Sequence, residues 1–586
     1  MIPIEAVIVG SVLALMLLCL FKEWLTIEAA VFSALSVLIL FNVLTPVEAL
    51  GGFANESVFT VIFFFIIAAA IQSTGMLNRL MKLLLGKERN LKIVLCKLML
   101  PVSALSGFMN NTPIVSMLIP VVRQWGKQAG IAPSKLLIPL SYAAILGGTM
   151  TLIGTSTNLF VHGLLLERGL PGFSMFDFFV IGFPLSLIAC VYMVFAGRKL
   201  LPCTADTEET LERETDDYCI PFLVPKGSKY IGKTLQKAKL RQLNQCFLVE
   251  IIRGARTIVP PSHAEEIQEN DILIFSGDIL SMKQLADPVN LIFYTENPLK
   301  DRTTAQLVEV MIPEASPLMN KRIKEIRFRS TYNAAVVAIR RQNMKIASGI
   351  GNTLLKRGDV LVLLTGKDFC QTWSKTKNFY IISSLETSAT ISTKKSLAIV
   401  SLILGVVALS AFQVISIFHA ALIGVIILFL TKTVTSTDAK SAIDLNVVIV
   451  MGSSVGIGYA VEKSGLSDLI LSGLFHDRAM SFFTVTLIMY LLTNVLTELI
   501  HNLAAAALTF PIGSSMAISM GYDPALIALV IAVAASCSFI SPIGYQTNLM
   551  VYGPGRYTFR DYLKVGLPLS LICMGTTLFI VNGIIV

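Results

Sequence analysis

The chain has 586 residues, 54% of them hydrophobic and 15% charged, and its formal net charge is +9. This large apolar share is typical of helices that face lipid, and it argues against an ordinary water-soluble domain, whose surface must be polar. The basic residues lie mostly beside apolar stretches, so we expect anionic lipid headgroups as their neighbours rather than nucleic acid.

Apolar stretches of about 20 residues, the length that crosses the hydrocarbon core of a bilayer, recur along the chain. The first of them lacks a basic leading segment and a small-residue cleavage site, so it is predicted to be a membrane span and not a signal peptide. The nine cysteines show no CxxC pair and are interpreted as small apolar residues. The stretches lie at 8–20, 29–44, 58–71, 178–195, 397–414, 420–430 and 567–586.

A polar segment separates two apolar halves, 1–199 and 394–586. It contains β-rich runs at Cys246–Ile252 and Val360–Leu364 and is predicted to be a soluble α/β module. Short motifs within it recur at a constant spacing, as in Asn270-Asp271-Ile272-Leu273 and Gly358-Asp359-Val360-Leu361. We therefore expect two copies of one small domain, at 200–300 and 301–393.

The two apolar halves repeat one another at a nearly constant offset of roughly 390 residues. Gly154-Thr155-Ser156-Thr157-Asn158-Leu159 matches Gly544-Tyr545-Gln546-Thr547-Asn548-Leu549, and Ala70–Gly75 matches Ala460–Gly465. Chance similarity between apolar segments would not keep one offset over several motifs. The halves are therefore predicted to be two copies of one transmembrane repeat.

Five spans and one re-entrant hairpin are predicted in each half, and an odd number of crossings makes the two repeats inverted. With this topology, 18 basic residues flank the spans on the inside and 3 on the outside, which is a strong positive-inside bias. The chain is thus predicted to be a multi-pass protein of the plasma membrane, here the bacterial inner membrane. Its central domains are expected in the cytoplasm and both termini outside.

Asn110-Asn111-Thr112-Pro113 lies between two apolar arms, each predicted at about 15 residues and thus too short to cross the bilayer. A polar tip followed by proline predicts a helical hairpin that enters the membrane and turns back. The second half has a copy at Glu498-Leu499-Ile500-His501-Asn502-Leu503. Irregular backbone at membrane depth is tolerated where it lines a cavity or binds something.

Glycine, hydroxyl and amide residues interrupt the apolar stretch 136–166 at Gly154–Asn158, and the second half repeats this at Gly544–Asn548. Such broken helices expose carbonyl oxygens to a cation and helix N-termini to an anion. Asparagine side chains add neutral oxygen ligands that suit a hard monovalent cation. No cluster of carboxylates suits calcium.

Other interpretations of these motifs are weaker. Asn, Ser and Thr can also serve as contacts between membrane helices, but two symmetric pairs of polar breaks favour the transporter pattern. The run Gly452–Gly458 lacks the Lys-Ser/Thr of a phosphate loop, so its glycines are expected to allow close helix packing. The chain has no Ser-His-Asp set and no metal-ligand spacing, so an enzyme is not predicted.

These motifs carry a family resemblance. The most specific are Pro542-Ile543-Gly544-Tyr545-Gln546-Thr547-Asn548-Leu549, the following Tyr552-Gly553-Pro554-Gly555, and Gly52-Phe53-Ala54-Asn55. Through them and the hairpin tips, the chain resembles the divalent anion/sodium symporter family, which carries dicarboxylates, citrate and sulfate. It is most similar to the long sulfate-type permeases with two TrkA-C-like domains in the central loop.

The resemblance implies a polytopic α-helical membrane protein of the elevator-type ion transporter fold. It would have two inverted repeats, re-entrant helical hairpins and broken helices, plus two small α/β cytoplasmic domains. Such carriers are usually homodimers that bind sodium at each hairpin tip and the anion between the tips. The implied sodium ligands are Ser106, Asn110, Asn111 and Gly154 at the first tip, and Thr497, Asn502 and Gly544 at the second. The implied substrate-binding residues are Asn111, Thr112, Thr155, Ser156, His501, Asn502, Tyr545 and Gln546.

The sequence departs from the family's Ser-Asn-Thr tip motif. Asn110 replaces the first serine, and the second tip reads His501-Asn502-Leu503 without either hydroxyl. A histidine there suits proton coupling, hydrogen bonding to an anion, or a structural pair, for which Glu498 is the expected partner.

The predicted function is secondary active uptake of a small divalent anion, sulfate above all, coupled to sodium. The alternatives are a dicarboxylate symporter, a proton-coupled anion carrier and a sulfate-sensing regulatory membrane protein. The sulfate preference comes from the resemblance alone. The cytoplasmic domains are expected to regulate the protein through a small ligand, such as a nucleotide, or through dimer contacts.

Overall fold

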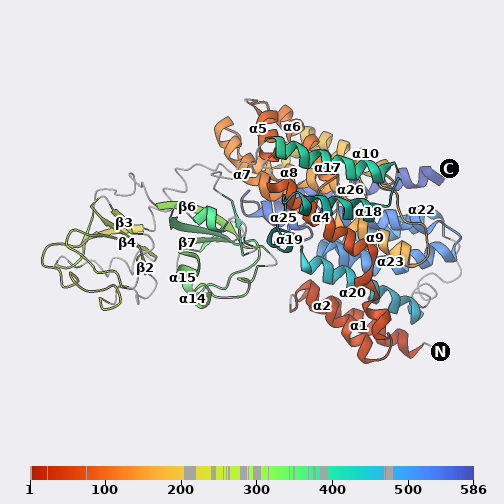
Figure 1. Cartoon of the computed structure of the whole chain (residues 1–586), viewed down its shortest axis with the longest axis horizontal. Helices are drawn as coiled ribbons and strands as arrows, with labels where there is room; N and C mark the ends of the chain where they lie inside the picture. Colours follow the sequence, from red (N-terminus) through yellow and green to blue (C-terminus); the bar gives the residue numbers. More distant parts are fainter. Residues whose placement is uncertain are drawn as a thin grey trace.

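The computed structural model contains a helical part, formed by both ends of the sequence, and two β-sheets from its middle, which lie to one side (Figure 1). Both ends of the chain lie on the side of the helical part that faces away from the sheets (Figure 1). The structure describes residues 3–585 except 23, 74–75, 87, 204–218, 239, 241–245, 255, 259–260, 262–263, 278–286, 288, 295–304, 314–315, 327, 342–343, 347–349, 367–368, 374–375, 377, 383–392, 413, 467–468 and 470–479.

The first half of the helical part runs from the N-terminus to residue 200. Most of its helices are apolar, and helices satisfy their own backbone hydrogen bonds, as a lipid environment requires. They are α1 (Ile4–Phe21), α2 (Ile27–Leu40), α3 (Pro46–Gly51), η1 (Gly52–Ala54), α4 (Glu56–Ser73), α5 (Met76–Leu85), α6 (Leu91–Ser106), α7 (Asn111–Ala129), η2 (Pro133–Lys135), α8 (Leu137–Gly148), α9 (Ser156–Glu167), α10 (Phe179–Tyr192), η3 (Met193–Gly197) and α11 (Arg198–Leu200).

The second half follows the sheets and repeats this order. Its helices are α17 (Thr393–Ala411), α18 (Ile417–Leu430), α19 (Ser436–Ala442), α20 (Leu445–Lys463), α22 (Phe482–Leu499), α23 (Asn502–Ser519), α24 (Pro524–Ser536), α25 (Gln546–Tyr552) and α26 (Phe559–Ile585).

Local signals and packing recur at equivalent places of the two halves. Thr45 and Glu48 form a capping box at the start of α3, and Thr435 and Asp438 form the same box at the start of α19, its counterpart in the second half. Helix α2 packs on α20 of the other half, and α18 packs on α4. The halves are therefore interlocked, because each supplies helices that cover the other.

Among the residues that the structure describes, six helical segments are long and apolar enough to cross a membrane, and a seventh is added if one bent pair counts as a single span. The bent pair joins α7 to η2–α8 at an angle of 116°. The segments are 46–71, 179–200, 445–463, 482–499, 502–519 and 559–583. The chain is thus a polytopic helical membrane protein. Three further apolar helices, α2, α18 and α24, have only 13 or 14 residues.

The hairpin arms differ in part from the prediction. Helices α6 and α7 of the first hairpin have 16 and 19 residues, and α22 and α23 of the second have 18 each and are long enough to cross. The prediction of arms too short to span is therefore wrong for the second hairpin. What separates α22 from α23 is the irregular backbone at Ile500 and His501, not a lack of length.

The break predicted inside 136–166 is present. Helices α8 and α9 have 12 residues each, which is about 18 Å of helix and too short for a bilayer core. Residues 149–155 between them are not helical, and 537–545 separate α24 from α25 in the same way.

The central segment forms two five-stranded antiparallel sheets of identical topology. The order β3-β2-β4-β1-β5 in the first corresponds strand by strand to β8-β7-β9-β6-β10 in the second. The strands are β1 (Cys219–Leu223), β2 (Cys246–Arg253), β3 (Arg256–Ile258), β4 (Ile272–Gly277), β5 (Ile292–Phe293), β6 (Ala305–Met311), β7 (Ala334–Arg341), β8 (Met344–Ile346), β9 (Val360–Gly366) and β10 (Tyr380–Ile381). Short helices α14 (Ile323–Ile326), α15 (Phe328–Tyr332) and α16 (Phe369–Trp373) and the 3-10 turn η4 (Ile350–Asn352) accompany the second sheet.

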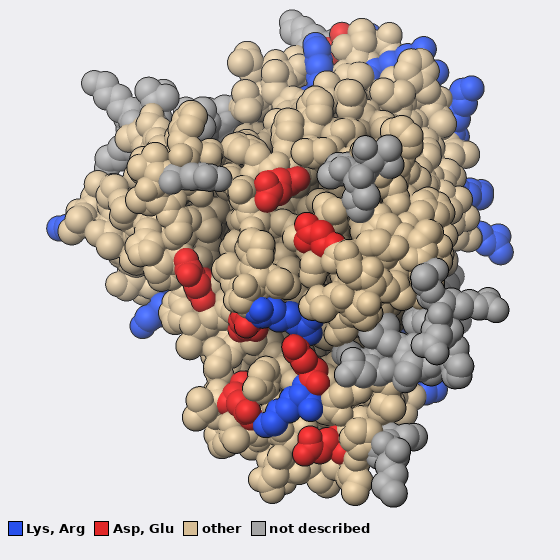
Figure 2. All heavy atoms as spheres, turned by 90° about the vertical axis from the view of Figure 1, so that its right-hand side faces the viewer, with Lys and Arg blue, Asp and Glu red and all other residues tan. Residues whose placement is uncertain are grey.

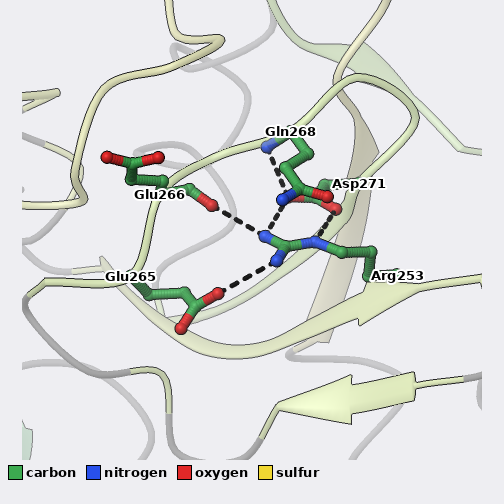
Figure 3. Close-up of polar contacts among 5 residues, drawn as sticks. All are labelled: Arg253, Glu265, Glu266, Gln268 and Asp271. Atoms are coloured by element: carbon green, nitrogen blue, oxygen red, sulfur yellow. Dashed lines mark hydrogen bonds and ion pairs between the residues drawn. The ribbon is translucent and has the colours of Figure 1, made fainter.

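A buried aspartate fixes the same loop in both sheets. Arg253 donates to both carboxylate oxygens of Asp271 at 2.8 and 2.9 Å, and it also binds Glu265 and the carbonyl oxygen of Glu266 (Figure 3). Arg341 holds Asp359 in the second sheet at 2.8 and 2.7 Å. Hydrogen bonds to Asp271 raise the pKa of Arg253, so this guanidinium stays charged.

We expect Arg253→Gln to lower the stability of the first sheet by about 2 kcal/mol, because it leaves the carboxylate of Asp271 buried without its cation. Hydrogen exchange of β2 and β4 in the full-length protein measures this change. The control is Lys229→Gln, since Lys229 pairs with Asp287 at 3.6 Å with side chains 56% and 38% exposed. An equal gain in exchange for both variants would contradict the special role of Arg253.

The face of the helical part that is turned away from the sheets carries acidic and basic side chains, which lie next to one another in its lower part (Figure 2). Separately, two ion pairs join the halves: Lys463 with Glu48 at 2.9 Å, and Arg168 with Glu462 at 3.0 Å. Such pairs contribute little to stability individually.

Candidate functional site

Each hairpin tip carries the same hydroxyl–amide contact. The hydroxyl of Ser106 lies 2.6 Å from Asn111 Oδ1 and 2.8 Å from the carbonyl oxygen of Ala144. At the second tip the hydroxyl of Thr497 lies 2.8 Å from the amide of Asn502 and 2.6 Å from the carbonyl oxygen of Ala535. Each partner of the second tip is the counterpart of one in the first, so the two tips have the same polar geometry although their sequences differ.

The amide of Asn502 faces three oxygen atoms. The amide atom that points into this cluster lies 3.0 Å from the carbonyl oxygen of Gly544, 2.8 Å from Thr497 Oγ1 and 3.3 Å from the carbonyl oxygen of Ala535. If this atom is Nδ2, it donates hydrogen bonds to them. If it is Oδ1, four oxygens converge, an arrangement that a cation stabilises. Neutral oxygens in such a cluster suit a monovalent ion.

Glycines make these approaches possible. A Cβ on Gly544 would overlap the hydroxyl of Ser538 and lie 2.9 Å from the carbonyl oxygen of Thr497. A Cβ on Gly154 would overlap the carbonyl oxygen of Gly148. The backbone of each break therefore packs directly against the neighbouring oxygens.

Two asparagines pin the breaks from within. Asn158 Nδ2 donates to the carbonyl oxygen of Thr151 at 2.9 Å, and Asn548 Nδ2 donates to that of Ser538 at 2.9 Å. The sequence suggests that these side chains offer oxygen ligands to a cation. In the structure, their amide nitrogens donate hydrogen bonds to carbonyl groups within the irregular segments. These residues hold the shape of the breaks.

The two halves meet at the hydroxyl of Tyr545. Asn111 Nδ2 donates to it at 2.5 Å, and the hydroxyl of Thr155 lies 3.4 Å away. Next to it, Thr112 Oγ1 donates to Gln546 Oε1 at 3.0 Å. Thr155 and Tyr545 occupy equivalent positions of the two halves, so the contact lies where the repeats meet. Tyr545 is 8% exposed and fills space that a threonine would leave open.

Asn110 and Ser156 have different surroundings. They line a cavity together with apolar residues of α4 and of the first tip, among them Phe64, Phe65 and Phe108. The resemblance implied a sodium ligand at Asn110 and a substrate contact at Ser156, and the structure places both on this apolar cavity.

His501 caps the start of α23, with its Nδ1 accepting from the backbone N–H of Leu503 at 3.4 Å. The carboxylate of Glu498 accepts three backbone N–H groups of the second break, from Phe539 at 2.8 Å, Ile540 at 2.9 Å and Ser541 at 2.9 Å. Glu498 was expected only as a structural partner of His501. Its carboxylate also holds the backbone of the second break, a role that no sequence signal indicated.

The structure thus brings together most of the residues that the sequence pointed to. Asn111, Thr112, Thr155, Tyr545 and Gln546 form one connected group, while Thr497, Asn502 and Gly544 form another. Sequence reasoning missed the carbonyl groups of Ala144 and Ala535, because a backbone oxygen has no signature of its own. In the described part of the chain, no group of three His, Cys, Asp or Glu side chains is placed to hold a metal ion.

Comparisons with known proteins match most of the chain. A family model described as citrate transporter (CitMHS) matches residues 15–534. An uncharacterized transporter of Synechocystis sp. is 32% identical over 582 residues, covering 96% of this chain and 94% of that protein. A Chlamydomonas reinhardtii protein with the provisional name sulfur deprivation response regulator is 30% identical over 565 residues, covering 93% and 96%. Sodium/sulfate cotransporter 1 of the same alga is 22% identical over 781 residues, covering 97% and 89%.

Proposed function

The chain belongs to the citrate transporter family, and on that premise we propose that it takes up a small divalent oxyanion, sulfate above all, by symport with sodium. The family makes it a secondary transporter, and relatives of low identity are named sodium/sulfate cotransporters. The choice of sulfate and sodium for this chain is the proposal.

The group around Tyr545 is the observation that carries the substrate proposal. The side chains hydrogen bonded to Tyr545 and Gln546 are those of Asn111, Thr155 and Thr112, all of them uncharged. Hydroxyl and amide groups can donate to the oxygens of a tetrahedral dianion. Because the phenol of Tyr545 fills the meeting point, a compact anion fits there better than an extended dicarboxylate.

Coupling to cations follows from charge. A dianion that enters a negative interior works against about 2.3 kcal/mol per charge for each 100 mV, so uncompensated uptake is unfavourable. Two co-transported cations offset this cost. With Asn502 Oδ1 turned toward Thr497 and Gly544, the cluster at the second tip offers one cation site, and the matching contact of Ser106 with Asn111 marks the equivalent place at the first tip.

We further propose that the halves are inverted repeats that move as an elevator within a homodimer. The contacts that recur at equivalent positions of the two halves support the repeat. The position of both chain ends opposite the sheets supports a cytoplasmic central module with outside termini (Figure 1). The identical strand order of the two sheets supports two TrkA-C-like domains, at 200–300 and 301–393.

A second candidate function is sulfate sensing. It is favoured by the relative named as a sulfur deprivation response regulator, which matches over nearly the whole chain. In that case the membrane part would bind the anion and report through the β-sheets without net transport.

Binding and uptake of radiolabelled sulfate, measured on the same purified protein in detergent and in proteoliposomes, separate these functions. We expect sodium-dependent binding together with accumulation driven by an inward sodium gradient. Binding without accumulation would favour the sensor. Accumulation driven only by a proton gradient would refute sodium coupling and direct attention to His501.

A further inference from the structure

The second sheet touches the helical part through a buried charged triad. Glu309 on β6 accepts from Arg123 on α7 at 2.7 Å and from Arg340 on β7 at 2.8 Å. The side chain of Glu309 is 4% exposed, and those of Arg123 and Arg340 are 12% and 14% exposed. Helix α7 begins at Asn111, so this contact lies about 18 Å along the same helix from the candidate site.

The triad does not belong to the common architecture of the two sheets. The strand registers show which residues of the first sheet occupy the positions of Glu309 and Arg340. Glu309 pairs with Val362 in the second sheet, and Pro221 pairs with Ile274 at the same place in the first. Arg340 pairs with Val360 in the second sheet, and Ile252 pairs with Ile272 in the first. The positions of Glu309 and Arg340 are therefore occupied by Pro221 and Ile252 in the first sheet. Only the second sheet carries the charges that meet Arg123.

The same sheet also packs against α25, which carries Gln546 at its start. A Cβ on Gly553, directly after α25, would lie 2.6 Å from Val360 Cγ2 and 3.3 Å from the carbonyl oxygen of Gly358. A Cβ on Gly358 would lie 3.0 Å from Leu549 Cδ1. The second sheet therefore contacts α7 of the first half and α25 of the second, the two helices whose N-termini meet at Tyr545.

The sheet also reaches other helices. Met311, Val360 and Ile382 belong to the large hydrophobic cluster that runs through the helical part. Burial, and then the nearby carboxylate of Asp444 at the start of α20, raise the pKa of Tyr380 to about 12. A movement of α7 and α25 relative to the start of α20 would therefore disturb this interface.

We propose that the second β-sheet is a latch, which holds α7 and α25 through Glu309 and restrains their movement during transport. An ion-pair network suits a reversible latch, because the desolvation cost of forming it nearly offsets the attraction between its charges. Released, Arg123 and Glu309 return to water at small net cost. Through α7 and α25, whose N-termini lie at the candidate site, the latch also connects the central module to that site.

Glu309→Gln and Arg123→Gln test the latch in the full-length protein. Arg123→Gln leaves Glu309 paired with Arg340, so it releases the helix without removing the charge partner inside the sheet. The matched control is Glu325→Gln, because Glu325 lies in the same domain and pairs with Arg322 at 3.9 Å with side chains 54% and 51% exposed. Hydrogen exchange at β6 and at the C-terminal part of α7 reports docking, and sulfate uptake reports restraint.

Both latch variants are expected to exchange faster at β6 and α7 and to raise the maximal uptake rate by about threefold or more, with a KM for sulfate within about twofold of the original. The control variant Glu325→Gln should change neither the hydrogen exchange nor the maximal uptake rate. Faster hydrogen exchange together with an unchanged or lower maximal rate of sulfate uptake would show that the latch does not restrain transport.

The uptake readout rests on the proposed function, whereas the exchange readout does not. If the unmodified protein takes up no sulfate, the proposed function fails, and the latch is judged by exchange before and after addition of sodium. If hydrogen exchange at β6 and at the C-terminal part of α7 is unchanged in both variants, the latch itself is overturned.

Discussion

Replacing Asn502 by alanine is expected to raise the sodium concentration for half-maximal uptake by about 10- to 100-fold, as the loss of a residue that shapes a metal site does elsewhere. The reason lies in the cluster formed by the amide of Asn502 with the oxygens of Gly544, Thr497 and Ala535. Without the amide, the cluster loses a ligand and the second hairpin tip loses its bond to α22. Sulfate uptake as a function of sodium concentration measures the effect.

Asn502→Asp tells the two orientations of the amide apart. If Asn502 offers its oxygen to a cation, aspartate keeps that ligand and sodium dependence survives. If Asn502 donates from its nitrogen, aspartate places a carboxylate against the carbonyl oxygens of Gly544 and Ala535, and uptake is lost. Asn582→Ala is the control, because Asn582 binds the backbone of α26 at 2.8 Å and Thr486 at 3.3 Å. A normal sodium dependence in Asn502→Ala would contradict a cation site at this tip.

Exchanging Tyr545 for threonine, the residue at the equivalent position of the first half, is expected to admit succinate. The change removes the ring that fills the space between the repeats but keeps a hydroxyl. We expect the ratio of succinate to sulfate uptake to rise by about tenfold, which corresponds to about 1.4 kcal/mol of discrimination.

Tyr545→Phe is the matched variant, since it keeps the ring and removes the hydroxyl that Asn111 binds at 2.5 Å. It leaves a buried amide without its acceptor, so the KM for sulfate is expected to rise by about tenfold while succinate stays excluded. Competition of each dianion against labelled sulfate measures both variants. Succinate uptake by the unmodified protein at the rate of sulfate, or its continued exclusion in Tyr545→Thr, would contradict the role of Tyr545 in selection.

Much of the site could be predicted because its signals are local. Glycine, proline and amide residues inside apolar stretches mark where a membrane helix stops, so the breaks at Gly154 and Gly544 and the tips at Asn111 and Asn502 were evident. The repetition at one offset then paired them. The β-runs and their repeat likewise predicted two small domains, and the structure has two sheets of one topology.

Contacts between distant segments could not be predicted in this way. Asn111 and Tyr545 are 434 residues apart, and their bond depends on how the halves pack. Glu498 bonds to backbone groups of the distant second break, which no side-chain pattern encodes. The contact of Arg123 with Glu309 joins the hairpin to the central module across 186 residues. The lengths of α22 and α23 also differ from the prediction, because a polar tip marks where a helix ends but does not limit how long it is.

The ratio of sodium to sulfate that enters the same proteoliposomes tests the account most directly. Both ions are labelled, an inward sodium gradient is imposed at constant pH, and initial rates are compared. With one cation site at each hairpin tip, the account predicts about two sodium ions for each sulfate. Sulfate entry without sodium, or sodium entry that sulfate does not stimulate, would contradict it.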